Sequence, residues 1–160
     1  MKSFKVAPVL TVIACFTLGL SHVAQAQPSP RIGTWKLNLA KSTYDPGPPP
    51  TSDTRTYEGT GDGEKATIEQ VAADGTHTTN TFTAKLDGPD VPITGNPNAD
   101  TVALKRINAS TIEATLKKGG KVVLTTTSVV SKDGKVMTQT AKGTNASGQP
   151  VNNRLVFDKQ

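Results

Sequence analysis

The chain has 160 residues, which is enough for one domain of ordinary size and too few for two. It carries 18 Lys and Arg residues against 13 Asp and Glu residues, a net charge of +5. Two of the cations, Lys2 and Lys5, belong to the first 26 residues, so the remainder has 16 basic and 13 acidic side chains, a net of +3. This excess is too small for a nucleic-acid or polyanion binder, and the sequence predicts no nucleic-acid partner.

The N-terminus has the pattern of a secretory signal peptide. A basic start at Met1–Lys5 is followed by the apolar run Val6–Leu20 and by the small residues of Ala24-Gln25-Ala26. The run is shorter than the roughly 20 apolar residues that cross a bilayer, so no stable membrane insertion is expected. Cleavage after Ala26 would release an exported domain, residues 27–160, to the periplasm or the medium. A lipid anchor at Cys15 is the less favoured alternative, because apolar residues continue beyond it.

The exported domain is poor in residues that carry catalytic chemistry. Cys15 and His22 leave with the leader, so His77 is the remaining histidine and no cysteine remains. These counts exclude disulfides, cysteine nucleophiles and zinc sites built from Cys and His. Several acidic residues in turns are interpreted as ordinary turn residues: Asp62, Glu64, Asp87 and Asp90. The sequence predicts no enzyme, no catalytic residue, no metal site and no cofactor.

After the leader, apolar and polar residues alternate with period two, and no helical period is found. The predicted strands are Thr34–Leu39, Asp53–Glu58, Lys65–Ala72, Thr76–Leu86, a short Val91–Ile93, Thr101–Ile107, Thr111–Lys118, Lys121–Ser131, Lys135–Lys142 and Val151–Asp158. Short turns connect most of them, and Gly119-Gly120 and Asp133-Gly134 favour hairpins. The chain is therefore predicted to be all-β, an antiparallel meander barrel of about 8–10 strands, with a two-sheet sandwich as the alternative.

Two connections are longer and rich in proline. They are Ala40–Ser52, which contains Pro46-Gly47-Pro48-Pro49-Pro50, and Asp87–Asp100. Proline offers no donor to a sheet, so both are predicted to be surface loops. Each is either a lid over a cavity mouth or a connector without a role.

The start of the first predicted strand, Gly33-Thr34-Trp35, resembles the Gly-x-Trp signature of the calycins, the superfamily of lipocalins and fatty-acid-binding proteins. The resemblance implies a lipocalin-like barrel whose Trp lies across the base. It also implies that an Arg from the last strand packs over the indole, and Arg154 is the matching position. Gly33, Trp35 and Arg154 are therefore expected to form a structural barrel floor.

The chain also resembles a group of uncharacterised exported bacterial proteins that share a Gly-Thr-Trp-Lys-Leu-Asn start. Further matches follow in the same order along the chain: Lys41-Ser42, Pro46–Pro50, Lys142–Asn145 and Gly148–Pro150. This resemblance covers nearly the whole exported domain and implies export and fold without implying an activity.

Four residues are candidates for the wall of an internal cavity: Arg106, Leu104, Thr126 and Phe82. Strict alternation from Val102 and Leu104 places Arg106 on the apolar face of its strand, where it would orient a ligand headgroup. The favoured alternative is a strand end at which the guanidinium reaches water. Thr126 lies on a strand whose two faces are both of mixed polarity.

The leading functional hypothesis is reversible binding of a small apolar or amphiphilic molecule inside the barrel. The second is a structural or interaction domain of the cell envelope that binds no ligand. A large internal cavity would favour the first over the second, and convergent ionisable groups in that cavity would favour an enzyme.

Overall fold

The computed structural model describes residues 28–145 and 147–160. The predicted signal peptide, its cleavage after Ala26 and the alternative anchor at Cys15 lie outside the described residues. No helix in the described ranges combines the length and the apolar character needed to cross a bilayer.

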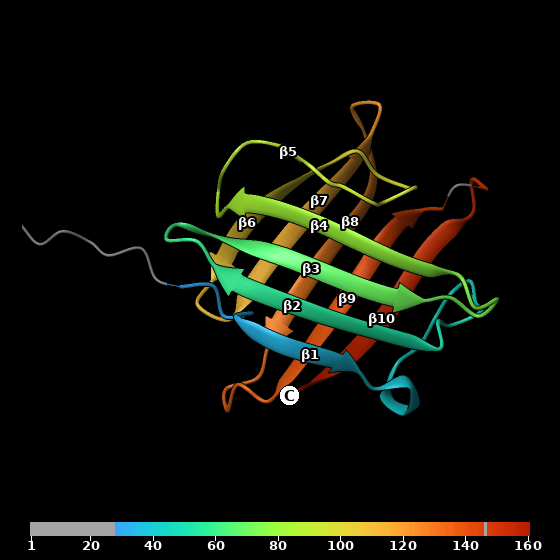
Figure 1. Cartoon of the computed structure of the whole chain (residues 1–160), viewed down its shortest axis with the longest axis horizontal. Helices are drawn as coiled ribbons and strands as arrows, with labels where there is room; N and C mark the ends of the chain where they lie inside the picture. The colour runs from blue at the N-terminus through green and yellow to red at the C-terminus, as the bar shows by residue number, and fades with distance from the viewer. Residues whose placement is uncertain (1–27, 146) are drawn as a thin grey trace, which may run out of the picture.

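The described chain is all-β, with ten strands and one short 3-10 helix, η1 (Leu39–Lys41) (Figure 1). The strands are β1 (Gly33–Leu37), β2 (Ser52–Gly59), β3 (Gly63–Val71), β4 (His77–Lys85), β5 (Val91–Pro92), β6 (Thr101–Asn108), β7 (Thr111–Lys118), β8 (Lys121–Val130), β9 (Val136–Thr144) and β10 (Pro150–Lys159). All neighbouring strands pair antiparallel, in the order β4-β3-β2-β1-β10-β9-β8-β7-β6-β5. The predicted antiparallel meander is confirmed.

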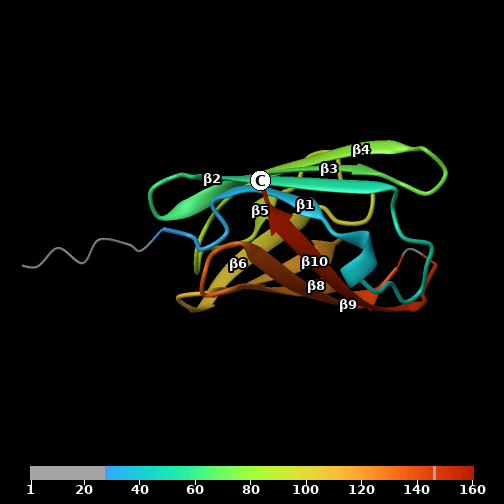
Figure 2. The same cartoon turned by 90° about the horizontal axis from the view of Figure 1, so that it is seen from below.

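The sheet curls into a nearly closed barrel. Seen edge-on, β1 to β4 form one layer and β6 to β10 the other (Figure 2), and the strands of the two layers cross steeply (Figure 1). The first and last strands join the layers on one side, with Trp35 opposite Lys159. On the other side, Thr81 of β4 exchanges two backbone hydrogen bonds of 2.9 Å with Thr94, just after β5. Few sheet edges therefore remain open to another chain.

Two glycine turns illustrate why the strand positions follow from the sequence. Gly119 and Gly120 connect β7 to β8 with φ of 55° and 76°, and Gly134, in the turn between β8 and β9, has φ of 69°. Residues with a Cβ adopt these positive φ angles at a cost in conformational energy, whereas glycine adopts them without that cost. The hairpins predicted at these glycines are present.

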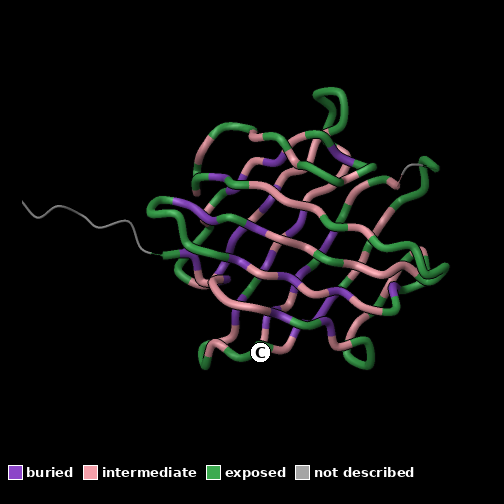
Figure 3. Tube along the Cα trace, viewed as in Figure 1, coloured by how far each residue is buried: buried purple, intermediate pink, exposed green. Residues whose placement is uncertain are grey.

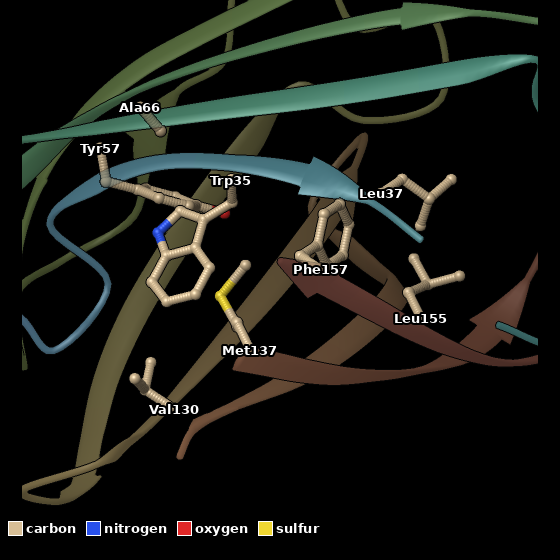
Figure 4. Packing of buried hydrophobic residues seen from close by; sticks show 8 residues of the cluster. All are labelled: Trp35, Leu37, Tyr57, Ala66, Val130, Met137, Leu155 and Phe157. Carbon is tan, nitrogen blue, oxygen red and sulfur yellow. The ribbon is translucent and has the colours of Figure 1, made fainter. Parts of the chain in front are cut away.

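Buried residues are spread along the strands of both layers, while the turns are mostly exposed (Figure 3). One core cluster fills the end of the barrel where β1 and β10 meet, and in it Trp35, Met137 and Phe157 point toward one another (Figure 4). A second, smaller cluster lies against β6 and β7 and contains Leu104 and Ile112. Between the two clusters the barrel interior is polar in part and hollow in part.

At the barrel floor, the cation that lies over the Trp35 ring is not the expected Arg154. Trp35 is fully buried, but the charge over its ring belongs to Lys159, whose Nζ lies 5.2 Å from the ring centroid. Gly33 makes this possible, because a Cβ at that position would lie 2.6 Å from Cε of Lys159. Arg154 is exposed, and its Nη1 donates to the carbonyl oxygen of Lys41. The expected contact between Arg154 and Trp35 is therefore replaced by Lys159, since alternation turns the side chain of Arg154 outward.

Candidate functional site

A cavity of about 480 Å³ lies inside the barrel between the two layers. Its volume is within the range of roughly 300–1,000 Å³ that is usual for small-molecule sites. Much of the wall is aliphatic or aromatic and comes from strands of both layers: Ile68, Phe82, Val102, Leu116, Leu124 and Leu155. An apolar molecule that entered this space would be removed from water on most sides.

The cavity opens toward the end of the barrel that carries the β3–β4 and β9–β10 turns. Exposed or half-exposed residues of this end, Ala72, Thr144 and Asn145, belong to its lining. Both proline-rich loops contribute as well: Tyr44 comes from the first, and the segment 96–99 from the second. Both loops are thus part of the cavity wall and do more than connect two strands.

An ion pair on β2 lies against one side of the cavity. Asp53 is fully buried and Arg55 nearly so, and the Nε and Nη2 of Arg55 donate to the two carboxylate oxygens at 2.9 and 2.8 Å. The guanidinium carbon lies 4.4 Å from the ring centroid of Phe157. Burial disfavours the charged form of Arg55, but the adjacent Asp53 more than offsets this, so the pKa of Arg55 is raised.

A second ion pair lies deeper, near the barrel floor. Arg31, just before β1, and Glu64, at the start of β3, are both fully buried and form a salt bridge through Nη2 and Oε1. Ser29 donates to the other carboxylate oxygen of Glu64, and the Arg31 guanidinium lies 4.6 Å above the Tyr57 ring. Glu64 was expected to be an ordinary turn residue. That interpretation is wrong, because the strand begins at Gly63 and turns the carboxylate into the barrel.

Two uncharged side chains connect these ion pairs into one network. Ser128 of β8 accepts from Arg31 Nη1 at 3.4 Å and from Gln139 Nε2 at 3.0 Å. Gln139, on β9, in turn accepts from Nη1 of Arg55. The network crosses from one layer of the barrel to the other, and such fully connected polar groups hold one another in place.

Trp35 positions the deep end of this network. Its indole Nε1 donates to the backbone oxygen of Arg31 at 2.7 Å. The segment before β1 is thereby held across the end of the barrel, with the Arg31 side chain pointing inward. The tryptophan thus has a second role besides filling the floor.

Three polar atoms at the cavity wall lack a hydrogen-bond partner among residues 28–145 and 147–160. They are Tyr44 Oη, Asn80 Oδ1 and Arg31 Nε. A buried polar atom without a partner costs about 1–3 kcal/mol, so such atoms at a cavity wall mark places where a bound molecule gains most.

Tyr44 provides a test of this geometry in the absence of ligand. Burial raises its pKa to about 12, the charge of Asp53 adds to the shift and Arg55 opposes it. The folded protein should thus keep the phenol proton over the range in which an unfolded chain loses it, from about pH 10 upward. The free energy of unfolding is therefore expected to fall as the pH rises from about 10 toward 12. Phenolate absorbance against pH, compared between the unaltered protein and Tyr44→Phe, would show the late ionisation of Tyr44. Ionisation of Tyr44 near the ordinary pKa of a tyrosine, about 10, would contradict the prediction.

The predicted cavity residues separate into two pairs. Thr126 and Phe82 lie in the cavity wall. Leu104 and Arg106 are not among the described residues that line it: Leu104 is buried in the second core cluster, and Nη2 of Arg106 donates to the carbonyl oxygen of Pro28. The arginine on the apolar face of β6 thus contacts the incoming N-terminal segment at the strand end.

Most of the polar network was missed by sequence reasoning, although one signal was present. Asp53, Arg55 and Tyr57 alternate on a predicted strand whose intervening residues are Thr54 and Thr56. Two charges at alternating positions beside a tyrosine indicate a polar interior face. No comparable local signal marks Arg31 or Glu64, because these two residues are 33 positions apart in the sequence.

No group of three or more His, Cys, Asp or Glu residues that could hold a metal ion is found within the described ranges. The titratable groups in the described cavity wall are two arginines and two tyrosines: Arg31, Arg55, Tyr44 and Tyr57.

The described residues form a ten-stranded antiparallel barrel with an internal cavity. No family model matches the sequence, and no curated protein matches it. Among solved structures, the chain is similar to zebrafish ileal bile acid-binding protein complexed with cholic acid. The identity is 16%, the match covers 82% of this chain and 100% of that chain, and the TM-score is 0.47.

Proposed function

We propose that the chain is an exported β-barrel that binds a small apolar or amphiphilic molecule in its internal cavity and does not transform it. The observation that carries the proposal is the cavity itself, about 480 Å³ of space with an aliphatic and aromatic wall and a few polar atoms without partners. A domain with a purely structural role would gain stability by filling this space with side chains, since empty volume in a core is destabilising.

The wall chemistry supports binding without catalysis. Both buried carboxylates lie behind the arginines with which they pair, and neither belongs to the described lining. The titratable groups that the described wall does present are arginines and tyrosines, and burial raises the pKa of Tyr44 to about 12, so this phenol can donate a hydrogen bond but does not act as a base at neutral pH. Export remains part of the proposal and rests on the N-terminal pattern of residues 1–26.

Filling the cavity tests the proposal. Ala141 of β9 is buried and lies in the cavity wall. Ala141→Trp would place an indole in the space, so affinity for a neutral apolar probe such as N-phenylnaphthylamine is expected to fall by more than about tenfold. Fluorescence titration of the probe measures the change, and native mass spectrometry of the exported protein reports any molecule retained from the cell together with the mass of the cleaved chain.

Thr140→Trp is the matched control. Thr140 is the preceding residue of the same strand and is exposed, so its indole would lie on the outer surface and leave binding unchanged. Equal losses in both variants, or no binding of any apolar or amphiphilic probe by the unaltered protein, would contradict the proposal and favour an interaction domain of the envelope.

A further inference from the structure

Both cations that face the cavity already have an anionic partner. Arg55 pairs with Asp53, Arg31 pairs with Glu64, and the formal charges of the two pairs sum to zero. A carboxylate bound among them would add a negative charge that nothing in the described interior neutralises. Burying such a charge is costly, because water no longer solvates it.

Three of the five N–H donors of Arg55 are also committed. A carboxylate is bound most strongly by the two parallel N–H groups along one edge of a guanidinium. In Arg55 the edge formed by Nε and Nη2 is occupied by Asp53, and Nη1 donates to Gln139. One face of the group is covered by Phe157. The Nε–Nη2 edge, which would otherwise recognise an anionic headgroup, is therefore used internally, and Gln139 takes one donor of the other edge.

The raised pKa of Tyr44 indicates that a negative charge is disfavoured at this part of the cavity wall. The phenolate form of Tyr44 would place a negative charge at the wall, and this form is disfavoured by burial and by Asp53 more than Arg55 favours it. A ligand carboxylate beside Tyr44 would experience the same desolvation and the same repulsion. The neutral phenol, in contrast, is a good hydrogen-bond donor to an uncharged oxygen.

The atoms without partners suit a neutral oxygen-bearing group. Tyr44 Oη and Arg31 Nε can donate to a hydroxyl or carbonyl oxygen, and Asn80 Oδ1 can accept from a hydroxyl. The first two come from the chain segments before and after β1, and Asn80 comes from β4. A hydroxyl group would use both kinds of wall atom without changing the charge of the interior.

We propose that the cavity selects an uncharged amphiphile, an apolar body with a hydroxyl, ketone or ester oxygen, over a carboxylate of the same length. The inference rests on the proposed binding function and specifies its ligand class. The internal ion pairs are the selecting device, because each holds a guanidinium that would otherwise attract an anion.

The test compares molecules that differ in the headgroup alone. Dodecanol, methyl dodecanoate and dodecanoate are titrated at neutral pH against bound N-phenylnaphthylamine, whose displacement gives each affinity. Dodecanol and the ester are expected to bind at least about tenfold more tightly than dodecanoate. Dodecanoate binding as tightly as dodecanol would overturn the inference while leaving the binding function in place. If the probe itself does not bind, the proposed function fails first.

An apolar cavity of any kind disfavours an ion, so a variant must show that the ion pairs contribute. Asp53→Asn removes the anion and leaves Arg55 without compensation, and the ratio of dodecanoate to dodecanol affinity is expected to rise by about tenfold or more. Glu58→Gln, on the outer side of the same strand, should leave the ratio unchanged, because Glu58 pairs with Lys65 at the surface. An unchanged ratio in a folded Asp53→Asn protein would overturn the role of the ion pairs.

Tyr44→Phe is a variant that, unlike Asp53→Asn, leaves no buried charge without a partner. The Tyr44 hydroxyl has no partner among the described residues, so its removal is not expected to lower stability. Dodecanol affinity should fall by about fivefold to tenfold relative to the affinity for N-phenylnaphthylamine, which has no hydroxyl or carbonyl oxygen to meet Tyr44. Equal affinities of dodecanol for both proteins would show that Tyr44 does not meet the ligand oxygen and would contradict the inferred site.

Discussion

Glu64→Ala is expected to lower the free energy of unfolding by about 3–5 kcal/mol. Arg31 and Glu64 are almost completely buried, with side-chain exposures of 2% and 0%. Removing the carboxylate would leave the guanidinium charged, buried and without compensation, and would also remove the acceptor of the Ser29 hydroxyl. Urea unfolding followed by Trp35 fluorescence measures the change.

Two comparisons isolate the buried charge as the cause. Glu58→Ala removes an acidic side chain on the neighbouring strand β2, where it is exposed and paired with Lys65 at 3.0 Å, and should cost less than about 1 kcal/mol. The double variant Arg31→Met with Glu64→Leu should recover much of the loss, because apolar groups of similar size replace a buried ion pair at little cost. Equal effects of Glu64→Ala and Glu58→Ala would show that the pair does not hold the floor together.

Trp35→Ala is expected to cost about 3–5 kcal/mol, the upper part of the range for large core side chains. Its indole is fully buried among Met137 and Phe157, so truncation leaves a cavity at the barrel floor (Figure 4). The change also removes the hydrogen bond to the backbone of Arg31, which positions the deep end of the polar network. Urea unfolding followed by far-UV circular dichroism is the measurement, since the variant lacks its tryptophan.

Trp35→Phe separates packing from hydrogen bonding. The phenyl ring keeps most of the apolar contact and loses the donor to Arg31, so a smaller loss of about 1–3 kcal/mol is expected. If Trp35→Ala were no more destabilising than Trp35→Phe, the packing of the indole would contribute little to the floor.

The positions of the strands and turns were predictable because they depend on local properties of the sequence. Alternation with period two marks a strand wherever it occurs, and paired glycines such as Gly119-Gly120 mark a hairpin because of the φ angles they allow. Nine or ten strands were expected, the tenth being the short Val91–Ile93, and the described residues form ten, in the same chain order. The consecutive hairpins also indicated the meander.

The candidate site was predictable only in part. Thr126 and Phe82 were expected in the cavity and lie in its wall, whereas Leu104 packs in a core cluster and Arg106 contacts Pro28. Alternation assigns residues of a strand to one face or the other, but it does not say how far along the barrel the cavity extends. That extent depends on which side chains from opposite layers meet.

By itself, the sequence determined the all-β class, the meander and the turn positions, because each depends on residues close together in the chain. The tertiary structure alone decided that Lys159, and not Arg154, lies over Trp35, since this follows from the pairing of β1 with β10. It also decided that Arg31 meets Glu64 and that Gln139 reaches Arg55. The Gln139–Arg55 contact joins the two layers, and the Arg31–Glu64 contact joins the segment before β1 to the start of β3. Only closure of the barrel, with its particular register, brings these groups within hydrogen-bond distance.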